Sequence, residues 1–200
     1  QTMKKKYFVL RENTALGPAR LEYYDSEKKF KAGALPKRSV TLSSCFSINN
    51  KCDARHRYTL ALFTKDSCLT MVCDSEEEQQ AWLQSMLDLR NLSADEDNSP
   101  VPLFDRIWPV TVKDKGVGSG RHLVPGQYRL CLTNTSLGLV RLNHEEPDIT
   151  FQLDSIRRCG NKDKFFFMEL GRGCKTGEGE LWLQVEDEII ALNMHDNILR

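Results

Sequence analysis

The sequence lacks the features that mark several large classes of protein. No apolar run approaches the roughly 20 residues that a membrane-spanning helix needs. Neither sign of charge is in excess, because 28 lysines and arginines balance 28 aspartates and glutamates. A general nucleic-acid-binding protein usually carries a basic excess, so this balance argues against a nucleic-acid partner.

The cysteines lack the spacing of a metal or redox site. There are seven, and no two are separated by the two-residue gap of a zinc knuckle or a thiol–disulfide motif. Most lie within apolar segments, as Cys45 and Cys73 do. We therefore expect buried, reduced thiols in a cytosolic protein.

Catalytic motifs are also missing. The glycine-rich segment at 116–120 lacks the dinucleotide-binding spacing. The segment at 171–176 resembles a phosphate-binding loop, but Cys174 occupies the place of its final glycine, and a strand is predicted after it where a helix is needed. The four histidines form no metal-ligand spacing. The sequence therefore predicts no enzyme, no cofactor and no metal site, and an enzyme that uses the 171–176 loop is kept as an alternative.

The balanced charge hides an uneven distribution along the chain. Residues 1–57 hold 13 Lys and Arg against 5 Asp and Glu, a net charge of +8. Residues 58–97 hold 2 against 9, which is −7, and residues 98–200 hold 13 against 14, which is −1. The first quarter is thus a basic block, which favours a surface that binds an anion.

An acidic, proline-containing segment at 93–102 (SADEDNSPVP) divides the chain into two halves of similar plan. Before it, short strands are predicted at 7–10, 20–24, 38–42, 45–48, 58–63 and 69–73. A helix over 75–91 follows, where Ser75 and Glu78 form a capping box. After it, strands are predicted at 107–112, 127–133, 137–142, 149–153, 164–170 and 180–185.

A final helix is predicted to have an apolar face that includes Ile190, Met194 and Ile198. Each half therefore consists of antiparallel strands closed by one C-terminal helix, and the fold class is mainly β with two capping helices. The first predicted strand has no partner before it and the last helix stops at Arg200. We therefore expect that both ends were cut from something longer.

Lysines gather at the start of the first strand. In an extended chain, Lys4 and Lys6 share one face with Phe8, while Lys5 lies on the other. Two ammonium groups at the mouth of a hairpin, with Arg11 at the end of the strand, can bind a polyanionic head group such as a phosphoinositide. The alternative is a strand end that only improves solubility.

Arginines form a second group, in the last third of the chain. Alternation places Arg157 and Arg158 on opposite faces of a strand, and Arg172 lies across a predicted hairpin. Two converging guanidinium groups suit a phosphotyrosine dianion, since each can donate two hydrogen bonds to phosphate. The alternative is ordinary surface charge.

Several segments resemble one known family. In the first half these are FVLR at 8–11, ARLEYY at 19–24, CDAR at 52–55 and QQAW at 79–82. In the second half they are YRLCLT at 128–133, SIRRCG at 155–160, FFF at 165–167 and GELW at 179–182. In this order they resemble the pleckstrin-homology (PH) and phosphotyrosine-binding (PTB) domains of insulin receptor substrate proteins. The resemblance implies two tandem PH-like β-sandwich or barrel domains: a PH domain at 1–92 without its first strand, a linker at 93–102, and a PTB domain at 103–200 with a truncated last helix.

The resemblance also implies roles for individual residues. Arg157 and Arg172 would hold the phosphotyrosine of an Asn-Pro-x-phosphotyrosine segment, which would add as a strand near 155–160. Secondary contacts to the phosphate or peptide would come from Arg158, Gly173, Ser155, Cys159, Gly160, Met194 and Ile198. Gly173 and Cys174 depart from the family pattern of Ser and Ala, which implies one hydroxyl donor fewer at the phosphate. Lys4, Lys6 and Arg11 would contact phosphoinositides.

The implied function is that of a cytoplasmic signalling adaptor. Its partners would be an activated receptor of the insulin or insulin-like growth factor type and inner-leaflet phosphoinositides of the plasma membrane. None of the five tyrosines begins a Tyr-x-x-Met site, so downstream effectors would bind outside this chain. The alternative is a scaffold of the related downstream-of-kinase type that binds other tyrosine kinases.

Overall fold

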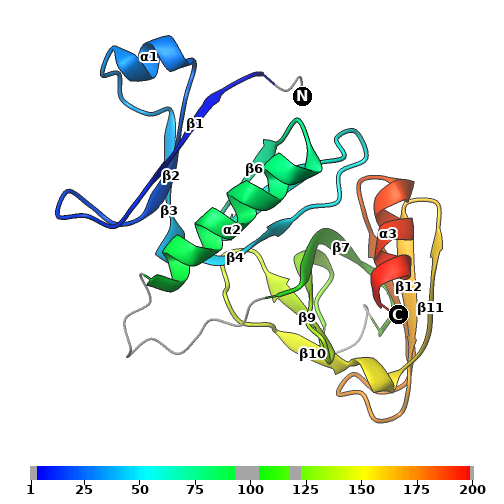
Figure 1. Ribbon diagram of the computed structural model, residues 1–200. Helices are drawn as coiled ribbons and strands as arrows, with labels where there is room; N and C mark the ends of the chain where they lie inside the picture. Colours follow the sequence, from blue (N-terminus) through cyan, green and yellow to red (C-terminus); the bar gives the residue numbers. More distant parts are fainter. Residues whose placement is uncertain (1–3, 93–103, 118–122, 199–200) are drawn as a thin grey trace.

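The computed structural model describes residues 4–92, 104–117 and 123–198, which form two β-rich halves (Figure 1). The predicted linker at 93–102 lies outside the described residues, and the glycine-rich segment at 116–120 is described only as far as residue 117.

The first half contains two three-stranded antiparallel sheets. One has the order β1-β2-β3, and the other β4-β5-β6. Their strands are β1 (Tyr7–Arg11), β2 (Arg20–Tyr24), β3 (Arg38–Thr41), β4 (Cys45–Asn50), β5 (Thr59–Thr64) and β6 (Cys68–Val72). A 3-10 turn, η1 (Leu42–Ser44), leads from the first sheet into the second. Alternate strand residues face a common core, whose fully buried members include Leu21, Leu42, Leu60 and Leu62.

Helix α2 (Glu76–Leu92) closes this core with Met86, which is fully buried. Ser75 caps the helix as predicted, because the Glu78 amide donates to Ser75 Oγ at 3.1 Å. The Glu78 side chain also reaches back, but its Oε2 accepts from the Asp74 amide at 2.7 Å, one residue before the Ser75 amide that a capping box uses. A further helix, α1 (Glu27–Lys31), was not predicted. It has only five residues and none is buried, so it shows no apolar period, although Ser26 caps its start.

The second half is a seven-stranded antiparallel sheet with the order β10-β9-β8-β7-β13-β12-β11. Its strands are β7 (Arg106–Gly116), β8 (Gly126–Leu132), β9 (Ser136–Arg141), β10 (Ile149–Gln152), β11 (Ile156–Lys162), β12 (Phe165–Leu170) and β13 (Gly179–Gln184). A 3-10 turn, η3 (Leu153–Ser155), precedes β11. Side chains from all seven strands meet in one apolar cluster, so the sheet must curl around it. Helix α3 (Glu188–Ile198) packs on β11 and β12 and completes the cluster (Figure 1).

The two halves pack against each other through a third apolar cluster. Phe46, Ala61 and Phe63 come from the first half, and Phe104, Ile107, Cys131 and Val140 come from the second. Arg129 of β8 crosses this boundary: its guanidinium donates to the carbonyls of Thr64, Lys65 and Ser67 in the β5–β6 turn at 2.9, 3.4 and 3.2 Å. Because Arg129 is only 3% exposed, the turn and the arginine form a buried polar contact between the halves.

All seven cysteines are free thiols. Cys45, Cys73 and Cys131 are buried, and the other four are half-buried. Burial raises the pKa of Cys45 and Cys131 to about 12 and that of Cys73 to about 11. These three thiols are therefore protonated and unreactive at neutral pH.

Candidate anion-binding site

Strand β11 forms one edge of the seven-stranded sheet and contains a bulge. Its register to β12 shifts between Ile156 and Arg158. Ile156 and Cys159 pack on the core, while both Arg157 and Arg158 are exposed. The prediction that the two arginines lie on opposite faces was wrong, because the extra residue of a bulge interrupts the alternation. Both guanidinium groups contact the Glu169 carboxylate, Arg158 at 2.7 Å and Arg157 at 3.7 Å.

Arg172 approaches from the loop between β12 and β13. The Gly171 amide donates to the Ser155 carbonyl at 3.0 Å, which anchors the loop beside the start of β11. A Cβ on Gly171 would lie 3.3 Å from the Ser155 carbonyl oxygen, a tight contact, so this glycine lets the loop backbone approach the start of β11 closely. Arg172 Nε and Arg157 Nη2 contact the same oxygen, Oε2 of Glu178, at 3.1 and 3.8 Å. The two guanidinium groups therefore converge on one point.

We call these three arginines and the glutamates that pair with them the arginine site. Two of these arginines and all three glutamates border a hollow of about 350 Å³, which is lined by Arg157, Arg158, Glu169, Leu170, Glu178, Gly179 and Glu180. Arg158 also lies 3.9 Å from Glu180. The exposed fraction of the side chains is 52% for Arg157, 67% for Arg158 and 84% for Arg172, so all three are open to a ligand. The guanidinium groups of Arg157 and Arg158 thus line the hollow together with three carboxylates, and Arg172 joins the site through its contact with Glu178.

Ser155 and Gly173 were predicted to make secondary contacts to the phosphate, and they differ in what they can offer to it. The Ser155 hydroxyl donates to the Gln152 carbonyl at 2.6 Å and accepts from the Cys174 thiol at 3.2 Å, so its proton is already used. Gly173 is exposed, and a Cβ there would meet no atom within 4 Å. The loop therefore has room for a side chain at position 173.

Gly160 and Cys159, which were also predicted to contact the phosphate or peptide, lie against other side chains of the second half. The Phe167 ring lies across Gly160, where a Cβ would come within 2.7 Å of it. The same ring stacks on Trp182 with centroids 5.0 Å apart, so Gly160 provides space for aromatic packing. Cys159 is half-buried against the core, and burial raises the pKa of its thiol.

Met194 and Ile198 of α3 lie in the core rather than on the surface. They are 0% and 2% exposed, so in this structure they present no surface to the docked peptide that was expected to pack on them. The exposed apolar residues of the helix are Ile189 and Leu192, at 49% and 48%.

The basic residues of the first half differ in how freely they can reach a ligand. Lys4 and Lys5 are exposed, whereas Lys6 pairs with Asp25. The Arg11 Nε atom lies 3.2 Å from Glu22, which is 5% exposed. Arg11 therefore pairs with a buried carboxylate, whereas it was expected to contact a phosphoinositide.

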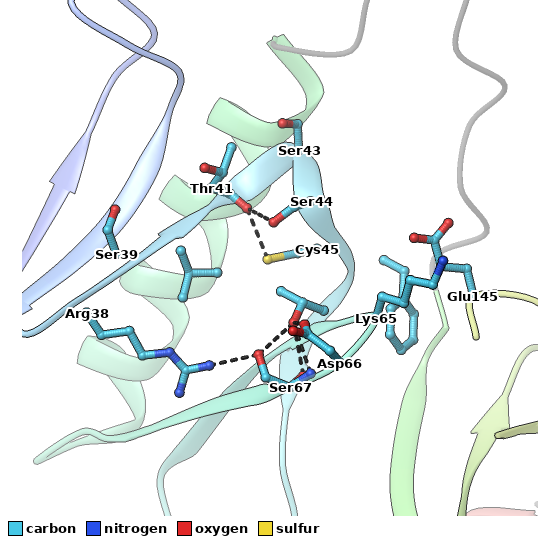
Figure 2. Close-up of a pocket in the computed structure, with 13 residues that line it drawn as sticks. Arg38, Ser39, Thr41, Ser43, Ser44, Cys45, Lys65, Asp66, Ser67 and Glu145 are labelled. Atoms are coloured by element: carbon cyan, nitrogen blue, oxygen red, sulfur yellow. Dashed lines mark hydrogen bonds between the residues drawn. The ribbon is translucent and has the colours of Figure 1, made fainter. Parts of the chain in front are cut away.

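A second hollow, of about 400 Å³, lies beside the β5–β6 turn (Figure 2). Figure 2 shows the Arg38 guanidinium directed at Ser67, to whose hydroxyl it donates at 2.8 Å. Lys65, Asp66 and Glu145 also line this hollow, so it carries both signs of charge. It has no pair of converging guanidinium groups comparable with the arginine site.

The glutamates of the arginine site were missed by sequence reasoning. A local signal exists for one of them, because Glu178 stands between Gly177 and Gly179 just after the Arg172 loop. Glu169 lies in the aromatic strand, where only the bulge in β11 brings both arginines to it.

Comparisons with known proteins cover nearly the whole chain. Family models match a PH domain at residues 1–89 and a PTB domain (IRS-1 type) at residues 110–200. All of the chain aligns at 45% identity with insulin receptor substrate 1 of Xenopus tropicalis and at 41% with that of Homo sapiens. In addition, 98% of it aligns at 42% with insulin receptor substrate 2-A of Xenopus laevis. The chain belongs to the insulin receptor substrate family.

For this member of the insulin receptor substrate family, the predicted fold class of tandem PH-like sandwich domains, each closed by a helix, is confirmed. Its two halves match a PH domain and a PTB domain of the IRS-1 type. The chain spans 32%, 19% and 20% of the lengths of these three relatives. The domain boundaries at 1–92, 93–102 and 103–200 stay a prediction.

Two further observations concern the described residues only. None of their helices is long and apolar enough to span a membrane. No group of three or more His, Cys, Asp or Glu side chains among them could hold a metal ion.

Proposed function

We propose that the PTB half binds an Asn-Pro-x-phosphotyrosine segment of an activated receptor of the insulin or insulin-like growth factor type. The convergence of Arg157 and Arg172 on one point carries this proposal. A phosphate dianion placed there would accept charge-assisted hydrogen bonds from both guanidinium groups. Arg158 lies on the same side and is close enough to add to the positive potential.

The edge position of β11 supports the peptide part of the proposal. An extended peptide can add to a sheet edge through backbone hydrogen bonds, and β11 ends the sheet formed by the described strands. A peptide paired with β11 would place its phosphotyrosine near the start of that strand, where Arg157 lies. Backbone hydrogen bonds to β11 would supply affinity that does not depend on the peptide sequence. The arginines would recognise the phosphate.

We further propose that the protein is a non-enzymatic, cytoplasmic adaptor whose PH half associates with phosphoinositides at the inner face of the plasma membrane. The net charge of +8 in residues 1–57 supports this, as does a hollow of about 600 Å³ lined in part by Lys4, Lys5 and Lys6. Two weak contacts made together at a membrane would reinforce each other through effective concentration.

The decisive experiment for the receptor site is a calorimetric titration of an Asn-Pro-x-phosphotyrosine peptide. We expect Arg157→Ala and Arg172→Ala each to weaken binding by about 1.5–3 kcal/mol, since each removes a hydrogen bond to a charged group. Arg141→Ala is a matched control, because Arg141 ends β9 and pairs with Asp148 just before β10, at the opposite end of the strand order from β11. Binding that survives both changes, or that ignores phosphorylation, would contradict the site assignment.

Lipid binding requires its own measurement. We expect the Lys4→Ala, Lys6→Ala double variant to sediment less with vesicles that contain a phosphoinositide. The control is Lys162→Ala with Lys175→Ala, which removes the same charge from exposed positions in the PTB half. Equal sedimentation of the two double variants would mean that Lys4 and Lys6 make no specific lipid contact.

A further inference from the structure

One carboxylate of the arginine site occupies the position that a bound phosphate would need. Oε2 of Glu178 lies 3.1 Å from Arg172 Nε and 3.8 Å from Arg157 Nη2. These are the two groups to which the proposed function assigns the phosphate. An oxygen shared by two guanidinium groups is also what a two-arginine phosphate site holds when it is occupied. Glu178 is therefore placed as an internal substitute for the ligand.

The other two glutamates of the site do not have this position. Glu169 pairs with Arg157 and Arg158, and Glu180 pairs with Arg158 at 3.9 Å. Among the ion pairs of the described residues, Glu178 alone contacts both Arg157 and Arg172. Glu180 is also held by the Trp182 indole, which donates to it at 3.1 Å.

The surroundings of Glu178 allow its carboxylate to move away. It precedes β13, between Gly177 at φ +78° and Gly179 at φ +149°, conformations that favour glycine. Its side chain is 53% exposed, so water can solvate the carboxylate once it leaves the arginines. Ion pairs, not packing, hold it in place.

We propose that Glu178 competes with phosphotyrosine inside the protein: its carboxylate neutralises Arg157 and Arg172 in the free protein and must leave when phosphate binds. This inference rests on the proposed function and names Glu178 as the residue that sets the affinity of that site. While Glu178 contacts the two arginines, the apparent affinity of the site for any anion is lowered by the same factor. The phosphate dianion, the strongest ligand for two guanidinium groups, still binds, whereas a single carboxylate in a ligand has no advantage over Glu178.

The test is a fluorescence-anisotropy titration of a labelled Asn-Pro-x-phosphotyrosine peptide with wild type and Glu178→Gln. We expect the variant to bind roughly two- to five-fold more tightly, a modest gain because exposed ion pairs are weak. The gain should shrink as salt rises, since salt screens the pairs that Glu178 makes. Melting curves of both proteins, followed by circular dichroism, check that the substitution leaves the fold intact.

Two variants make the measurement specific. Glu146→Gln removes the same charge from an exposed position between β9 and β10, and no gain is expected. Glu180→Gln releases only Arg158, so its gain should be smaller than that of Glu178→Gln.

Unchanged or weaker binding by Glu178→Gln, in a protein that still distinguishes the phosphorylated peptide from the unphosphorylated one, would overturn the inference. Glu178 would then orient the arginines without competing for them. An equal gain in Glu146→Gln or Glu180→Gln would assign the effect to general charge and overturn it as well. If wild type binds both peptides alike, the proposed function itself is contradicted and the inference falls with it.

Discussion

At the scale of single residues, the loop that bears Arg172 has few hydroxyl donors for the proposed phosphate. Gly173 has no side chain, and the Ser155 hydroxyl is already donated to the Gln152 carbonyl. The Cys174 thiol fills the neighbouring space by contacting Ser155 at 3.2 Å. In the complex that we propose, the arginines would therefore carry phosphate recognition largely by themselves.

Restoring a hydroxyl in this loop should strengthen binding. Gly173→Ser fits without displacement, because a Cβ there meets no atom within 4 Å and the backbone is not in the left-handed region. We expect about 1 kcal/mol of added affinity for the phosphopeptide, or roughly five-fold, in a calorimetric titration. Gly173→Ala is the control, since it restricts the loop in the same way without a donor. If Gly173→Ala gains as much as Gly173→Ser, the hydroxyl is not responsible.

At the scale of secondary-structure elements, a buried carboxylate ties β1 to β2. Glu22 accepts from the Arg20 Nε and the Tyr24 hydroxyl at 2.7 Å each, and from Arg11 Nε at 3.2 Å. Burial raises the pKa of Glu22, but the three hydrogen bonds together outweigh burial and lower it below the ordinary 4.5. The folded protein therefore binds this proton less tightly than the unfolded chain does.

This network should make the PH half sensitive to acid. A lowered pKa contributes stability that is present above about pH 4.5 and is lost as the pH falls further. We expect Glu22→Gln to lower the free energy of unfolding by about 1–3 kcal/mol at pH 7. The difference from wild type should narrow below about pH 4.5, as measured by urea unfolding at several pH values.

A surface glutamate provides the comparison for Glu22. Glu27 forms an exposed pair with Lys31 on α1, and Glu27→Gln should change stability by less than about 0.5 kcal/mol at any pH. A Glu22→Gln deficit that stays constant down to pH 3 would contradict the role of the carboxylate charge.

At the scale of the whole molecule, one arginine connects the two halves. Arg129 caps three carbonyls of the β5–β6 turn, and its guanidinium lies 5.2 Å from the Phe46 ring centroid and 5.7 Å from that of Phe63. Burial lowers the pKa of Arg129. Removing its side chain would take this donor away from the Thr64 and Lys65 carbonyls, would leave the Ser67 carbonyl with the Thr64 amide, and would open a gap beside both rings.

We therefore expect Arg129→Ala to loosen the contact between the halves. Wild type should melt in one cooperative transition in scanning calorimetry, whereas Arg129→Ala should melt at a lower temperature and in two separable steps. The cost should be about 1–3 kcal/mol, as is typical when one partner of hydrogen bonds to a charged group is removed. Arg141→Ala serves as the control, because Arg141 is exposed and its partner Asp148 lies in the same half. An unchanged single transition in Arg129→Ala would show that the apolar cluster alone holds the halves together.

How far sequence reasoning reaches depends on the range of the interactions involved. Strand β12, helix α2 and the cap that Ser75 forms on α2 all depend on residues a few positions apart, and all were predicted. Strand β11 is different. Only Ile156 of its seven residues is buried, and the bulge beside it brings Arg157 and Arg158 to one side. No local pattern marks such a bulge, since the partner strand decides where the extra residue fits.

By itself, the sequence determined the class of the fold and the plan of two halves, and it supplied the arginines that we propose bind an anion, because turn residues, apolar periods and charged groups are local properties. Only the tertiary structure decided that Glu178 stands between Arg157 and Arg172, that Met194 and Ile198 face the core, and that Arg129 joins the halves. Each of these depends on distances between residues far apart in the chain. Such distances follow from how the strands register and how the halves pack, and the order of residues alone does not specify them.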